Sequence, residues 1–267
     1  MINTCVRAAS ALTLLLLSAC NDNSTPDSTI LLPDTGNVTI VKNEYVNCGD
    51  LEQQLKHSLP YLLQKKQDWV VLGSSSAAGA GASNYQNSWA GMLASQYADV
   101  TVHNFARGGY RTYQALSSDC IVNLTRPQPD EAHNFEKAMS VAPDLVIISF
   151  PSNDQASGYA NTEALFNLLA LRAMFESKGV PVVILSAQPR NVSLQVQQAL
   201  SEFYTVSAST FSPCFVDVFQ PMVSGVAMLK SDFDSGDGVH PNDAGHRVIF
   251  QQLMAMLNAK HCVDYQG

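Results

Sequence analysis

The sequence predicts an α/β protein built as a three-layer α/β/α sandwich around a five-stranded parallel sheet. Short apolar runs rich in β-branched residues alternate with longer segments of helical periodicity along most of the chain. Several of these runs contain almost no polar residue, which is typical of strands that helices cover on both faces of a parallel sheet. Regular alternation of strands and helices indicates right-handed β–α–β crossovers and a single sheet between two helical layers.

Five segments have the composition of buried strands, and most of the helical segments lie between them. The expected strands are residues 69–73, 100–105, 144–150, 180–187 and 214–218. The expected helices are residues 51–64, 86–97, 133–141, 162–177, 194–207 and 242–257. No internal repeat interrupts this alternation, and about 220 residues suffice for one domain with a complete hydrophobic core.

The N-terminal segment has the features of a secretory signal. Arg7 precedes an apolar run over residues 8–17, and the sequence Leu-Ser-Ala-Cys ends at Cys20. The run is shorter than the roughly 20 residues that a membrane-spanning helix needs. The segment resembles a bacterial lipoprotein signal, which implies cleavage before Cys20 and lipidation of that cysteine. The alternative is an ordinary secreted protein with a chance cysteine at this position.

We therefore expect three regions along the chain. Residues 1–20 form a lipoprotein signal peptide, and residues 21–43, which are rich in Asn, Ser, Thr, Asp and Pro, form a flexible tether. Residues 44–267 form the folded domain. The protein is expected in the bacterial cell envelope, where the lipid on Cys20 anchors it to a membrane and the domain faces the periplasm or the cell surface.

Net charge and cysteine content indicate which partners, disulfides and metal sites to expect. The net charge of −8, with no basic stripe, argues against a nucleic-acid partner. Four cysteines remain in the exported domain, and they predict two disulfides with three possible connectivities. No CxxC or CxxH spacing occurs among them, so a structural zinc site is not expected. These cysteines are Cys48, Cys120, Cys214 and Cys262.

A serine-rich turn directly follows the first expected strand. The sequence Gly-Ser-Ser-Ser-Ala-Ala-Gly runs from Gly73 to Gly79, and a helical pattern begins shortly after it. Such a turn between a strand and a helix is typical of sites that hold a nucleophile or a phosphate. The Gly-Lys-Ser/Thr of a phosphate-binding loop is absent, and Ala77 replaces the second glycine of the α/β-hydrolase nucleophile elbow. A serine nucleophile is the interpretation that remains, and it needs a base.

An Asp-x-x-His sequence can supply that base, because the carboxylate orients the imidazole. The first such pair begins a helix away from any strand end. The last lies within the C-terminal helix, where a surface pair is expected. Only the middle pair lies in a glycine-containing loop ahead of a helix, and loops on a rigid scaffold often carry catalytic side chains. In chain order the pairs are Asp130/His133, Asp237/His240 and Asp243/His246.

Four short motifs in a fixed order make the chain resemble the SGNH/GDSL hydrolase family. The matching segments are Gly73–Ser76 with Gly79, Asn104 with Gly109, Pro151–Asp154, and Asp237–Pro241. Their order and their placement at strand ends agree over residues 69–257. The resemblance implies the flavodoxin-like sheet of that family and ester hydrolysis without a metal or organic cofactor.

The resemblance also assigns roles to individual residues. Ser75 matches the nucleophile, His240 the general base, and Asp237 the carboxylate that orients the base. The backbone N–H groups of Ser75 and Gly109 and the side-chain amide of Asn153 match the oxyanion hole. A glycine at position 109 suits this role because it allows the backbone to approach a substrate closely.

Two positions depart from the family pattern. Ser74 replaces the usual Asp before the nucleophile, and Pro151 replaces the usual Gly of the third motif. Neither residue performs the chemistry, so the departures indicate a divergent subgroup and affect the substrate more than the mechanism.

The leading hypothesis is an exported serine esterase that removes acetyl groups from carbohydrate, since the sequence has no apolar lid segment that would cover a long acyl chain. A lipase, lysophospholipase or thioesterase of the same fold is the nearest alternative. An acyltransferase would use the same residues. A non-catalytic surface lipoprotein that binds a glycan is the alternative from a different class.

Overall fold

The structure is a computed structural model that describes residues 28–33, 38–49, 51, 66–150 and 152–259. The predicted signal peptide, Cys20, Cys262 and all but the first residue of the helix expected over residues 51–64 lie outside these ranges. No helix in the described ranges is long and apolar enough to cross a membrane.

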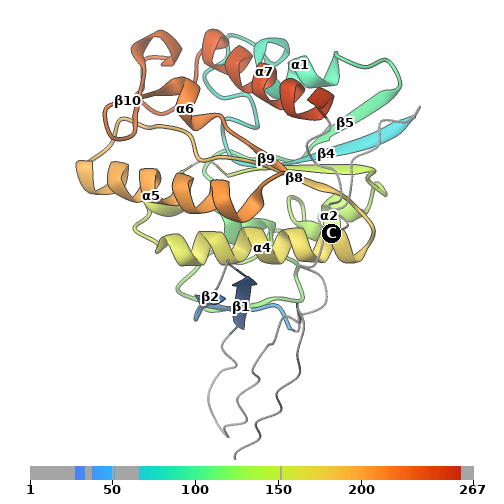
Figure 1. Cartoon of the computed structure of the whole chain (residues 1–267). Coiled ribbons are helices and arrows are strands. Elements are labelled where there is room, and N and C mark those ends of the chain that lie inside the picture. Colours follow the sequence, from blue (N-terminus) through green and yellow to red (C-terminus); the bar gives the residue numbers. More distant parts are fainter. Residues whose placement is uncertain (1–27, 34–37, 50, 52–65, 151, 260–267) are drawn as a thin grey trace, which may run out of the picture.

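A five-stranded parallel sheet forms the centre of the domain (Figure 1). Its strand order is β5-β4-β7-β8-β9. The strand that comes first in the sequence, β4, therefore lies between the second, β5, and the third, β7. This is the flavodoxin-like order, in which ligands bind outside the carboxyl ends of the strands where the order reverses. The predicted fold class is therefore confirmed. The strands are β4 (Gln67–Gly73), β5 (Val100–Asn104), β7 (Leu145–Ser149), β8 (Val182–Leu185) and β9 (Phe215–Val216).

Helices cover both faces of this sheet. Helices α1 (Trp89–Ala94) and α7 (Asp243–Ala259) lie on one face. Helices α2 (Phe135–Met139), α4 (Asn161–Ser177) and α5 (Leu194–Phe211) lie on the other. All five lie where helical periodicity predicts them, with ends that differ by a few residues.

Alternate side chains of each strand enter two separate cores. In β4, Trp69 and Val71 pack in the core beneath α1 and α7, whereas Val70 and Leu72 pack in the core beneath α4 and α5. All four side chains are fully buried. This burial on both faces explains the nearly continuous apolar sequence of the strands.

Shorter elements connect the layers. They are α3 (Asn153–Ala156), α6 (Phe219–Met222), three 3₁₀ turns, η1 (Tyr85–Asn87), η2 (Thr112–Ala115) and η3 (Ser231–Phe233), and two antiparallel pairs, β3 (Val46–Asn47) with β6 (Ile121–Val122) and β10 (Val223–Ser224) with β11 (Met228–Leu229).

The segment predicted as a flexible tether is partly structured, which corrects that prediction. Strands β1 (Ser28–Pro33) and β2 (Val38–Asn43) pair as an antiparallel hairpin, and β2 packs on α4 (Figure 1). At its end, the buried amide of Asn43 donates to Oδ1 of Asn167 at 3.0 Å. The polar composition of residues 21–43 concealed two short runs of β-branched and leucine residues, which can pair as strands.

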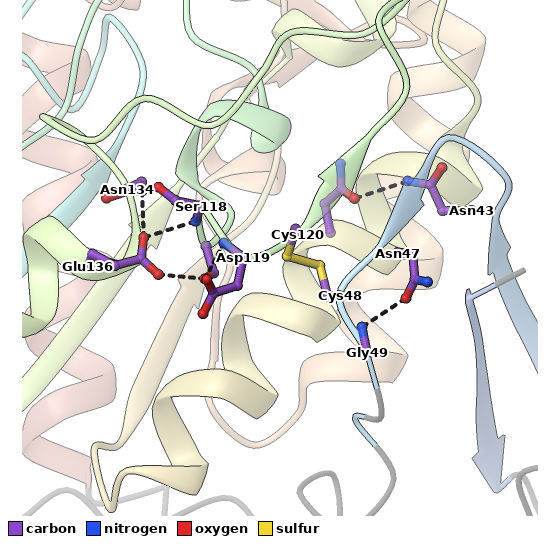
Figure 2. Close-up of a disulfide and its surroundings, with 11 residues drawn as sticks. Asn43, Asn47, Cys48, Gly49, Ser118, Asp119, Cys120, Asn134 and Glu136 are labelled. Carbon is purple, nitrogen blue, oxygen red and sulfur yellow. Dashed lines mark hydrogen bonds between the residues drawn. A yellow bond between two sulfur atoms is a disulfide. The ribbon is translucent and has the colours of Figure 1, made fainter. Parts of the chain in front are cut away.

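A disulfide joins Cys48 to Cys120 (Figure 2). The bridge joins the residue that follows β3 to the residue that precedes β6. Two residues before Cys120, the N–H of Ser118 donates to Glu136 of α2 at 3.0 Å. Cys214 is also disulfide-bonded. The Cys48–Cys120 bridge is one of the pairings that the three predicted connectivities allow, and Cys262 lies outside the described residues.

Candidate active site

The serine-rich turn begins where β4 ends, at the point where the strand order reverses. The N–H of Ser74 donates to the carbonyl of Ser149 at the end of β7, at 3.1 Å. A Cβ on Gly73 would lie 2.3 Å from that carbonyl oxygen. Because only glycine fits there, the two strand ends stay in close contact and hold the turn that carries Ser75.

His240 and Asp237 come to this turn from the loop before α7. Nε2 of His240 lies 2.9 Å from Oγ of Ser75. Nδ1 of His240 lies 2.5 Å from Oδ2 of Asp237. A carboxylate can only accept a hydrogen bond, so Nδ1 carries the hydrogen and the neutral ring leaves Nε2 free to accept the Ser75 hydroxyl proton.

The environment of Asp237 favours its ionised form. Desolvation alone would raise the pKa of this half-exposed carboxyl group, but hydrogen bonds from the His240 ring and from the N–H groups of His240 and Val239 hold its pKa well below the usual range. The two N–H groups donate to Oδ1 at 2.8 Å. Asp237 therefore stays negative beside His240, which is the charge that stabilises an imidazolium.

Backbone contacts fix the loop that carries this pair. Oδ1 of Asp234 accepts hydrogen bonds from the N–H groups of Gly236 and Gly238, both at 2.9 Å. The carbonyl of Gly238 accepts from the N–H of Asn191 at 2.7 Å. The Asp237/His240 pair thus lies on a short loop with several internal and external hydrogen bonds.

The three groups predicted for the oxyanion hole are the backbone N–H groups of Ser75 and Gly109 and the side-chain amide of Asn153. Among the described residues, the backbone N–H groups of Ser75 and Gly109 donate to no other group. Gly108, next to Gly109, lies so near that a Cβ on it would be 3.8 Å from Cβ of Ser75. The amide of Asn153 donates one hydrogen to the carbonyl of Tyr110, at 2.9 Å, and among the described residues no group accepts the other.

The structure thus brings Ser75, His240 and Asp237 into direct contact, and the hydrogen bond from Asn153 to the carbonyl of Tyr110 joins the third motif to the segment of Gly109. It also adds Arg190, which follows β8 in the sequence Gln-Pro-Arg-Asn and donates to Oδ1 of Asn153 at 3.2 Å. The position of Arg190 after a strand end was the signal available in the sequence, but its partner was not predictable from spacing.

A second addition is the buried carboxylate of Asp154. It accepts hydrogen bonds from the N–H of Thr112 at 3.1 Å and from its hydroxyl at 2.7 Å. Thr112 follows Gly109 by three residues, so Asp154 ties the second motif to the third. Burial raises the pKa of Asp154 to about 6.

The other two Asp-x-x-His pairs do not form such a dyad. Nδ1 of His133 contacts the carbonyl of Phe105, whereas Asp130 accepts a hydrogen bond from Tyr110. His246 is fully buried and contacts the carbonyl of Ala80. The expectation of a surface pair at Asp243 and His246 was therefore wrong, because α7 turns this face toward the serine loop.

No group of three or more His, Cys, Asp or Glu side chains in the described ranges has the geometry to hold a metal ion.

The fold and the site together define the class of SGNH-type hydrolases, with a polar site at the carboxyl edge of a flavodoxin-like sheet. Residues 71–248 match the GDSL-like Lipase/Acylhydrolase family, so more than half of the chain is covered and the chain belongs to that family. It is an acylhydrolase. A search of the curated proteins finds no match.

Among solved structures, 79 chains match this fold. A GDSL-like lipase from Bacteroides thetaiotaomicron has 18% identity and a TM-score of 0.54, with 75% of this chain and 92% of that chain covered. A carbohydrate acetylesterase family member from Sinorhizobium meliloti has 16% identity and a TM-score of 0.52, with 74% and 100% covered. A two-domain esterase active on acetylated mannans has 18% identity and a TM-score of 0.50, with 74% and 50% covered.

Proposed function

We propose that this chain is an exported serine esterase that removes O-acetyl groups from carbohydrate. The observation that carries the proposal is the continuous contact from Ser75 through His240 to Asp237, at 2.9 and 2.5 Å. A hydroxyl, an imidazole and a carboxylate in this sequence form the activated nucleophile of serine hydrolases.

The reaction follows from this geometry in two halves. Oγ of Ser75 attacks the ester carbonyl carbon while Nε2 of His240 takes the hydroxyl proton. The resulting tetrahedral intermediate collapses, the sugar oxygen leaves with the proton from His240, and an acyl-serine forms. Water then attacks the acyl-serine with His240 again as base, which releases the acid and restores the hydroxyl. Asp237 stabilises the imidazolium in both halves.

The negative oxygen of each tetrahedral intermediate needs hydrogen-bond donors. The free N–H groups of Ser75 and Gly109 and the second amide hydrogen of Asn153 are available for it. One donor of this kind lowers the barrier by about 2.7–4 kcal/mol. We therefore expect these three groups to supply a large part of the rate enhancement.

Two observations support carbohydrate as the substrate. Similar solved structures include a carbohydrate acetylesterase family member and an esterase active on acetylated mannans, and the sequence has no apolar lid segment. The likeness to a GDSL-like lipase favours a lipid ester as the second candidate. The two candidates differ in the acyl chain length of the esters that the protein should hydrolyse: short for acetylated carbohydrate and long for lipid.

We further propose that Cys20 carries the lipid that anchors the protein to a membrane of the cell envelope. Residues 1–20 have the charge, apolar run and small residues of a lipoprotein signal. The test is mass spectrometry of the mature N-terminus, with Cys20→Ser as the comparison. A diacylated Cys20 and release of the variant into the soluble fraction are expected; an unmodified mature N-terminus would exclude the anchor.

The first measurement for the enzymatic function is hydrolysis of p-nitrophenyl esters, from acetate to long chains, by the full-length protein and by Ser75→Ala. We expect activity on short chains that the variant lacks, and release of acetate from acetylated glycans. Activity that rises with chain length would move the assignment to lipid esters. A folded protein with no turnover on any of these substrates would contradict the esterase proposal and favour a glycan-binding lipoprotein.

A further inference from the structure

Arg190 contacts Asn153 of the candidate oxyanion hole, and its guanidinium is near enough to Asp237 to feel the charge of that carboxylate. Its guanidinium donates through Nη1 to Oδ1 of Asn153 at 3.2 Å and to the hydroxyl of Ser152 at 3.4 Å. Its backbone N–H donates to the carbonyl of Ala227 at 2.7 Å, so the main chain at this residue is also held.

Within the part of the chain that the structure describes, the charge of Arg190 has no direct counter-ion. Among the described residues, Arg190 forms no ion pair, and its buried Nε has no hydrogen-bond partner. Desolvation lowers the pKa of Arg190, and the charge of Asp237 opposes this effect. A partly buried cation without a contacting anion is costly, so a compensating role at the site is expected.

The contacts of Asn153 show what that role is. A side-chain amide has one accepting and one donating end. Arg190 requires the accepting end, and the carbonyl of Tyr110, 2.9 Å away, requires the donating end. Rotation of the amide by 180° would break both contacts, place Oδ1 against the Tyr110 carbonyl, and remove the donor from the oxyanion hole.

We propose that Arg190 is a positioning residue for Asn153, which fixes the amide so that its free N–H points at the developing oxyanion. This inference deepens the proposed esterase function and depends on it. Arg190 acts through Asn153 and does not contact the reacting atoms, so its effect requires the Asn153 amide to be present.

A double-mutant cycle on p-nitrophenyl acetate tests the proposal, with wild type, Arg190→Met, Asn153→Ala and the double variant. We expect Arg190→Met to lower kcat by about 10- to 100-fold with KM within about threefold. In the Asn153→Ala background, the same substitution should change kcat by less than about twofold, because coupled residues are non-additive. Arg107→Met, which removes an exposed cation from the neighbouring loop, is the matched control and should leave kcat unchanged.

Three results would overturn the proposal. The first is an equal loss from Arg190→Met with and without Asn153. The second is an effect of Arg190→Met confined to KM, which would make Arg190 a substrate-binding group. The third is an equal loss of kcat on Arg107→Met, which would reduce the effect to general charge.

Folding is controlled separately. Thermal unfolding of each variant shows whether the substitution is tolerated, and Arg190→Lys, which keeps the charge but not the planar fork, replaces the Met variant in the cycle if needed. The activities of Ser75→Ala and Arg190→Met together separate this inference from the proposed function. Full activity of Ser75→Ala would refute the esterase mechanism, whereas an inactive Ser75→Ala with a normal Arg190→Met would refute only the role of Arg190.

Discussion

Gly81 lies against His240 so closely that no side chain fits between them. A Cβ on Gly81 would be 2.9 Å from Cβ of His240 and 2.2 Å from the carbonyl oxygen of Pro241, and the φ angle of Gly81 is +90°. Gly81 belongs to the loop that carries Ser75. This contact therefore sets the distance between the loop of Ser75 and the loop of His240.

Substitution of Gly81 by alanine should separate these loops. Displacement of a reacting group by about 1 Å can cost 10²-fold in rate, so we expect kcat/KM for p-nitrophenyl acetate to fall by at least about that factor in Gly81→Ala. Gly179→Ala is the matched control, because Gly179 has a φ of +77° with no neighbour within 4 Å of a Cβ. The Gly179→Ala variant should lose about 1–2 kcal/mol of stability to backbone strain and keep its activity. Equal activities of the two variants would refute this role for the contact.

Asp237→Asn should disable the base without removing the side chain. An amide at this position can donate to Nδ1 of His240 and so favour the tautomer whose Nε2 carries hydrogen and cannot accept the Ser75 proton. By comparison with the serine-protease triad, we expect kcat to fall by roughly 10²- to 10⁴-fold. Steady-state kinetics with p-nitrophenyl acetate measures this loss.

The comparison for Asp237→Asn is Asp130→Asn, in another Asp-x-x-His sequence of the chain. Asp130 bonds to Tyr110 and to the N–H of Ala132. It is not hydrogen-bonded to His240, so its variant should keep kcat within a few-fold of wild type. Similar losses of kcat in both variants would mean that the hydrogen bond from His240 to Asp237 has no specific role in the reaction.

The sequence was sufficient for the parts of the fold and site that depend on local pattern. Most of the strands follow from nearly continuous apolar runs, because burial on both faces leaves few polar positions in them; β5, which reads Val-Thr-Val-His-Asn and is mostly half-buried or exposed, is the exception. Ser75 and the Asp237/His240 pair were predicted as candidates because each lies at a strand end or in a loop next to a helix, and their side chains are in contact.

The remaining features depend on contacts between distant segments. The link from Arg190 to Asn153 joins residues 37 apart, and no local pattern indicates it. Strand β2 packs on the distant helix α4, a contact that the polar composition of residues 21–43 does not indicate. His246 was expected at the surface because its spacing from Asp243 fits a helical pair equally well on either face of α7.

The Cys48–Cys120 bridge should stabilise the domain without taking part in the chemistry. It closes a segment of 72 residues, for which the loss of unfolded-state entropy corresponds to roughly 4 kcal/mol. We expect the double substitution of both cysteines by serine to lower the free energy of unfolding by about 2–4 kcal/mol in urea titrations. The folded fraction should keep the wild-type kcat. A loss of stability below about 1 kcal/mol would show that the fold holds these segments together without the bridge.

Asp154 should make stability depend on pH in an unusual direction for a carboxyl group. Burial raises its pKa to about 6 in the folded protein, compared with about 3.9 for an unfolded Asp. The folded chain thus binds this proton more tightly. The contribution of Asp154 to stability is fully present below about pH 4 and is lost as the pH rises to about 6. Since one pKa unit corresponds to about 1.4 kcal/mol, the loss is roughly 3 kcal/mol.

The difference in unfolding free energy between wild type and Asp154→Asn isolates this contribution. Asparagine does not titrate, so wild type should lose roughly 3 kcal/mol relative to the variant between pH 4 and pH 7. Loss of a hydrogen bond to Thr112 changes the unfolding free energy of the variant by the same amount at every pH.

His246 has the opposite effect, because desolvation lowers its pKa and its contribution to stability declines as the pH falls below about 6.5. That effect is common to both proteins and cancels in the difference. Parallel stability curves, measured by urea unfolding across this pH range, would show that Asp154 does not titrate in the folded protein.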